Sequence, residues 1–147
     1  MMRLLFISTS IACCFAVSSH GQEVSTCSEA LDEYSKLRDQ ALNRFNLRNK
    51  KMDKFVSRFT GKTKAEMLST GYCTQMEDVL ISAKATTDAF YELKQRMDYA
   101  YVLCSDPDTT NKAIDTLTSD ANDAYYGSLS VYEQLKSSYD DVCEGDL

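Results

Sequence analysis

The chain has 147 residues, of which 44% are hydrophobic, and 16 Lys and Arg face 22 Asp and Glu, so the formal net charge is −6. A chain of this length predicts one domain, and its negative charge argues against a nucleic-acid-binding protein. Histidine is the commonest general base and metal ligand in proteins, and the chain contains only one, His20. We therefore expect no enzyme, no metal site and no other cofactor.

The first 21 residues have the pattern of a secretory signal peptide. A short segment that ends at Arg3 precedes the apolar run LLFISTSIACCFAV (residues 4–17), and small or polar residues lead to Gly21. The run is too short to span a bilayer. We expect cleavage after Gly21, although a site two residues earlier also fits. Cleavage of this leader removes His20 and leaves 126 residues (147 minus 21). We expect residues 22–147 to form one secreted, extracellular domain.

The cysteines predict two disulfides. Cys13 and Cys14 lie in the leader, and no C-x-x-C pair occurs among the other four cysteines, which are Cys27, Cys73, Cys104 and Cys143. Four cysteines in an oxidising compartment favour disulfides, whereas a zinc site would need closer spacing.

Apolar residues recur at gaps of three, four and seven, which predicts helices throughout. A long helix is expected from Ser25 or Thr26 to Phe59, with Gly61 just beyond its end. Arg38 and Arg48 fall within its apolar stripe, so we expect the middle of this stripe to be shallow or partly hydrated.

A short helix should follow, with a capping box at residues 63–66 and Gly71 at its end. A second capping box at residues 74–77 predicts the start of a long helix that reaches Cys104. Asp106 is the expected cap of the last helix, and Pro107 its first residue. This helix should reach Val142, with Gly127 as a point of bending or weakness.

Helix lengths predict how the cysteines pair. Short connections make neighbouring helices antiparallel, which places Cys27 and Cys104 at one end and Cys73 and Cys143 at the other. Bridged Cα atoms must lie within about 7 Å. We therefore predict an all-α fold, an antiparallel bundle of three long helices plus one short helix, with disulfides Cys27–Cys104 and Cys73–Cys143. A break of the first helix at residues 46–49 would overturn this pairing.

Charge is unevenly distributed along the chain. Residues 36–64 contain ten basic and two acidic residues, whereas residues 65–147 contain five basic and sixteen acidic ones. Five basic residues at helical spacing predict one basic face, formed by Arg44, Arg48, Lys51, Lys54 and Arg58. This face would bind an acidic protein surface or a polyanion such as heparin or phospholipid. The more frequent alternative is a solvated face balanced by the acidic helices.

Tyrosine is the second candidate signal, with nine Tyr and no Trp in the chain. Successive helical residues point about 100° apart, so Tyr125 and Tyr126 cannot both face the core. Exposed tyrosine favours a protein interface. The alternative is a tyrosine at the core rim with its hydroxyl in water.

A carrier of a small hydrophobic ligand is the alternative function. Insect odorant-binding proteins are secreted, acidic, helical and of this size, but the C-x3-C element of their cysteine pattern is missing here. A carrier requires a cavity of several hundred Å3. Seven residues could line it or else form plain core, namely Phe55, Phe59, Met67, Leu68, Met76, Phe90 and Met97.

The predicted mature chain resembles the small helical salivary proteins of anopheline mosquitoes, of the albicin and anophensin type. The resemblance rests on the secretion signal, the single helical domain of this size and the four cysteines, and it carries over no functional residue. It implies an inhibitor of host defence in a blood meal, because members of that family block the alternative complement convertase and some are linked to the contact system. We thus expect a secreted inhibitor of a host plasma protein complex. A structural or reproductive-tract secretion is a third interpretation.

Overall fold

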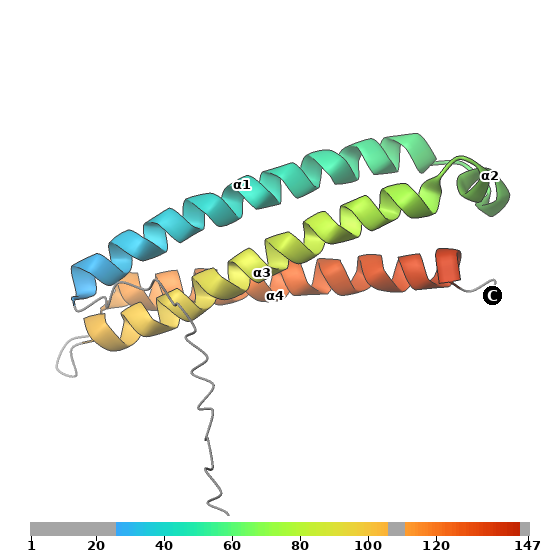
Figure 1. Ribbon diagram of the computed structural model, residues 1–147. Coiled ribbons are helices and arrows are strands. Elements are labelled where there is room, and N and C mark those ends of the chain that lie inside the picture. Colours follow the sequence, from blue (N-terminus) through green and yellow to red (C-terminus); the bar gives the residue numbers. More distant parts are fainter. Residues whose placement is uncertain (1–25, 106–110, 145–147) are drawn as a thin grey trace, which may run out of the picture.

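The computed structural model describes residues 26–105 and 111–144, and all regular secondary structure in these residues is helical. The elements are α1 (Cys27–Phe59), α2 (Lys64–Ser69), α3 (Tyr72–Cys104), α4 (Lys112–Tyr139) and a π-helical turn, η1 (Asp140–Glu144). Three long helices run alongside one another, and α2 lies at the turn between α1 and α3 (Figure 1). The predicted all-α bundle with one short helix is confirmed, whereas the signal-peptide prediction falls outside the described residues.

The first helix follows the prediction closely. Thr26 caps it in a reciprocal capping box, in which the Glu29 amide donates to Thr26 Oγ1 (3.3 Å) and the Thr26 amide donates to Glu29 Oε2 (3.1 Å). The helix continues through residues 46–49 without the break that would have changed the disulfide pairing. It ends at Phe59, and Gly61 adopts a left-handed φ of 79° that favours glycine.

The turn into α3 differs from the prediction. The capping box of Thr63 and Glu66 opens α2 as expected. The second predicted box, at residues 74–77, is wrong, because α3 already begins at Tyr72 with Gly71 as its N-cap at φ 80°. A left-handed glycine turns the chain directly into the helix, and this early start places Tyr72 in the core and Cys73 in a disulfide.

The last helix begins later than predicted. Lys112 is its first residue, and the Asn111 side chain accepts a hydrogen bond from the Ile114 amide (3.4 Å) as its cap. Asp106 and Pro107, the predicted cap and first residue, lie outside the described residues. The helix runs without interruption through Gly127, where a bend or a weak point was expected.

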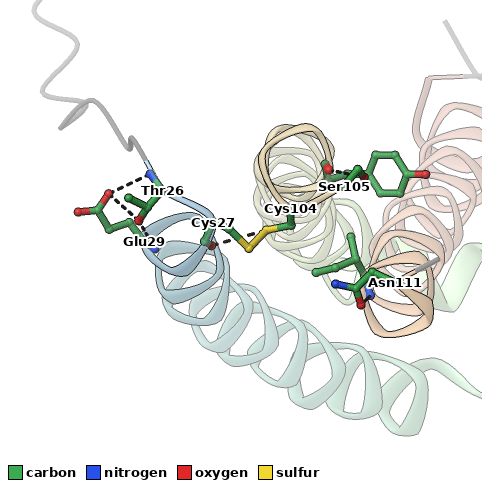
Figure 2. Close-up of a disulfide and its surroundings, with 8 residues drawn as sticks. Thr26, Cys27, Glu29, Cys104, Ser105 and Asn111 are labelled. Carbon is green, nitrogen blue, oxygen red and sulfur yellow. Dashed lines mark hydrogen bonds between the residues drawn. A yellow bond between two sulfur atoms is a disulfide. The ribbon is translucent and has the colours of Figure 1, made fainter. Parts of the chain in front are cut away.

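Both predicted disulfides are confirmed. Cys27–Cys104 and Cys73–Cys143 have Cα–Cα distances of 5.0 and 5.8 Å. One disulfide lies at each end of the bundle. Figure 2 shows Cys27–Cys104 between the first turn of α1 and the last turn of α3, next to the Thr26–Glu29 cap. None of the described helices is long and apolar enough to cross a membrane.

The core has two parts, one toward each end of the bundle, and α3 packs along both α1 and α4. The larger cluster lies near the Cys27–Cys104 end and includes Tyr34, Phe90 and Met97. The smaller one lies near the Cys73–Cys143 end and is formed by Phe55, Phe59, Tyr72, Met76 and Val79. In sequence, Arg48 lies between the segments of α1 that enter the two clusters, as its position in the apolar stripe suggested.

Two core tyrosines predict alkaline sensitivity. Burial raises the pKa of the Tyr34 and Tyr72 hydroxyls above the ordinary value. The folded state therefore favours the neutral phenol, and the corresponding stability is present below the unfolded-state pKa of about 10 and is lost as pH rises above it. We expect urea unfolding to show a falling free energy above about pH 10, and a Tyr34→Phe/Tyr72→Phe variant to lose less. An equal loss in both proteins would contradict this assignment.

Candidate binding surfaces

Most of the predicted basic face lies on the outside of α1, but several of its side chains form hydrogen bonds or ion pairs with neighbouring parts of the bundle. Arg44 Nη1 donates to the Ala85 carbonyl (3.2 Å), and Lys51 Nζ pairs with Asp78 Oδ1 (2.8 Å), both on α3. Arg58 Nη2 donates to the Thr70 carbonyl (3.3 Å) beside the α2–α3 turn. Lys54 is exposed. These contacts help to hold α1 against its neighbours.

Arg48 does not share this exposure, since its side chain is only 6% accessible to solvent. At 100° per residue the five basic positions spread over about 120° of the helix, and Arg48 lies at the edge nearest the core. Its guanidinium carbon lies 4.6 Å from the Phe45 ring centroid, and Nε and Nη2 donate to Asn49 Oδ1 at 3.3 and 2.9 Å. Burial lowers the pKa of this guanidinium, which nevertheless stays charged.

Arg48 lines an open-sided groove between α1 and α4 with a volume of about 360 Å3. Phe90 of α3 forms part of its wall, and α4 contributes mostly small side chains. A Cβ atom at Gly127 would have no neighbour within 4 Å, so the missing side chain leaves real space. The complete lining is Leu42, Phe45, Arg48, Phe90, Asp123, Ala124, Gly127, Ser128 and Val131.

This groove is not where the sequence placed a ligand pocket. Of the seven proposed lining residues, only Phe90 borders it. The others fill or flank the core, apart from Leu68, which is 40% exposed. The signal that was missed is the set of small residues on α4, because Ala124, Gly127 and Ser128 all line the groove.

The other flank of α4 carries an aromatic surface, defined here as Tyr91 of α3 with Tyr125 and Tyr126 of α4. The ring centroids of Tyr91 and Tyr125 are 5.3 Å apart, and those of Tyr125 and Tyr126 are 5.0 Å apart. Tyr126 is 59% exposed and Tyr91 45%. The prediction that Tyr125 and Tyr126 cannot both be buried is confirmed.

A shallow hollow of about 390 Å3 adjoins the aromatic surface, with Leu129 and Tyr132 in its wall. Two lysines beside it are paired within α3, because Lys84 binds Asp88 (2.8 Å) and Lys94 binds Asp98 (2.6 Å). The hydrogen bonds that both lysines donate to these aspartates raise the pKa of each lysine. The surface therefore presents apolar rings and phenol hydroxyls between charges that are already balanced.

Within residues 26–105 and 111–144, no group of three or more His, Cys, Asp or Glu side chains could hold a metal ion. Comparison of the chain with protein-family models, curated proteins and solved structures gave no match. The described residues define a disulfide-linked three-helix bundle with a groove on one flank of α4 and an aromatic surface on the other.

Proposed function

We propose that the protein is a secreted, non-catalytic inhibitor that binds a host plasma protein complex through its aromatic surface. The two disulfides support secretion, because such bonds persist in oxidising compartments. The first target to test is the alternative-pathway convertase of complement, which the resemblance to the albicin-type salivary proteins implies.

The observation that carries this proposal is the contact of Tyr91, Tyr125 and Tyr126 at a surface where two of the rings are 45% and 59% exposed. Tyrosine offers a large apolar area and a hydroxyl donor on a side chain with only two rotatable angles, so it is enriched among residues that dominate binding energy. Disulfides hold α3 at both ends and η1, the turn that continues α4, which lowers the entropy lost on binding.

The basic residues of α1 have a secondary role in this proposal. Exposed Lys54 and the neighbouring exposed Lys50 increase the positive potential on one side of an otherwise acidic protein. Such asymmetry accelerates encounter with an acidic partner and makes the association rate sensitive to salt, with less effect on the lifetime of the complex.

The test measures binding of the assembled convertase to the immobilised mature protein. We expect the Tyr91→Ala/Tyr126→Ala variant to bind at least about tenfold more weakly, because removal of a central tyrosine commonly costs about 2 kcal/mol or more. The matched control is Tyr101→Ala, a tyrosine on α3 with 40% exposure outside the aromatic surface. Absence of binding by the wild-type protein would reject the convertase as target. Equal losses in both variants would reject the aromatic surface as the site.

A further inference from the structure

The groove between α1 and α4 has no role in the proposed inhibitor, because it lies on the other flank of α4 from the aromatic surface. Its volume of about 360 Å3 falls within the range of small-molecule sites, about 300 to 1,000 Å3. The chain creates this space by placing a glycine and an alanine on α4 where larger side chains would close the gap to α1. The apolar residues of its wall are Leu42, Phe45, Phe90, Ala124 and Val131.

Arg48 brings an unbalanced positive charge to this apolar wall. An arginine residue that is 94% buried normally pairs with a carboxylate, but no carboxylate in the described residues lies within ion-pair distance of Arg48. Its partners are the Asn49 amide oxygen and the face of Phe45. Both are weaker partners for a cation than an anion would be.

Arg48 keeps free donors on a side chain that lines the groove. Nε and Nη2 bind Asn49, whereas Nη1 makes no hydrogen bond with another described residue. No fully buried side-chain nitrogen in the described residues lacks a hydrogen bond, so Nη1 retains contact with solvent. Since Arg48 lines the groove, an anion that enters it would find the N–H groups of Nη1 unoccupied by any other described residue.

We propose that the groove binds a small amphipathic monoanion, a fatty carboxylate, with its head group on Arg48 and its chain along the apolar wall. The volume lies near the lower end of the range for small-molecule sites, which favours a single acyl chain. This site is independent of the aromatic surface and of the inhibitor function.

Asp123 at the edge of the groove opposes an anion, and its position explains why the head group belongs at Arg48. Asp123 is exposed, so water screens its carboxylate, whereas the Arg48 guanidinium lies in a region of lower dielectric. Coulombic attraction to the buried charge therefore outweighs repulsion from the exposed one. The ammonium group of an apolar amine would be attracted to Asp123, but it would be repelled by Arg48, which would stay without an anionic partner.

The experiment is calorimetric titration of the disulfide-intact mature protein with dodecanoate, dodecanol and dodecylamine. We expect dodecanoate to bind most tightly. Arg48→Met should weaken dodecanoate binding by about tenfold or more, because a charge-assisted contact is lost, and leave dodecanol binding unchanged. Replacement of an unpaired buried charge by an apolar side chain should leave the fold intact.

A second variant tests the space itself. Gly127→Leu fills the groove, improves helix propensity and meets no atom within 4 Å at Cβ, so it should fold and lose binding of all three ligands. Lys54→Gln, an exposed basic residue on the same helix, is the matched control and should bind dodecanoate as the wild type does. Tighter binding of dodecylamine, equal dodecanoate binding by Arg48→Met, or no binding by the wild type would each overturn the proposal. The Tyr91→Ala/Tyr126→Ala variant should retain dodecanoate binding, which separates this site from the inhibitor function.

Discussion

Replacement of Cys27 and Cys104 by alanine should lower the free energy of unfolding by about 4 kcal/mol, the largest single effect that we expect. The disulfide closes a loop with a sequence separation of 77, so its loss restores much chain entropy to the unfolded state. It also holds the first turn of α1 against the last turn of α3. Urea unfolding followed by circular dichroism measures the difference.

The second disulfide provides the comparison. Cys73–Cys143 has a sequence separation of 70, so the loop-entropy model predicts nearly the same loss for Cys73→Ala/Cys143→Ala. A loss below about 1 kcal/mol for either pair would mean that the unfolded chain is already compact at those ends.

The Phe59→Ala variant should lose about 3 to 5 kcal/mol, an effect comparable to the loss of a disulfide. Phe59 is 5% exposed at the end of α1, and its ring centroid lies 5.0 Å from that of Phe55 and 5.1 Å from that of Tyr72. Truncation removes ring contacts from the smaller core cluster and leaves a cavity that the short α2 cannot fill.

The control for Phe59→Ala is Leu47→Ala on the same helix. Leu47 is 54% exposed, so its truncation should change the free energy of unfolding by less than about 0.5 kcal/mol. If both variants lost the same amount in urea unfolding, the smaller cluster would not be a stabilising core, and the two-part description of the interior would fail.

Much of the fold followed from local rules in the sequence. The Thr26 cap, the uninterrupted periodicity to Phe59 and the two disulfides are consequences of helix length and capping chemistry. The start of α3 was missed because two capping signals compete within six residues, and the left-handed Gly71 prevails over the box at residues 74–77. Asn111 was overlooked because Asp106 and Pro107 offered a stronger local signal.

The candidate sites were harder to predict, because they depend on how each helix is rotated about its axis. Spacing alone grouped Arg48 with the basic face, although its side chain is buried and lies over the Phe45 ring. Tyr125 and Tyr126 could be recognised as a surface pair, but their partner Tyr91 comes from another helix. The groove could not be predicted, because it depends on the separation of the α1 and α4 backbones, which no local sequence pattern encodes.

The most direct test of the proposed inhibitor is lysis of rabbit red cells by human serum with magnesium and without calcium, in the presence of the purified mature protein. This condition isolates the alternative complement pathway. We expect dose-dependent protection at submicromolar protein, with less protection by the Tyr91→Ala/Tyr126→Ala variant. Unchanged lysis at all concentrations of the wild-type protein would contradict the proposed function.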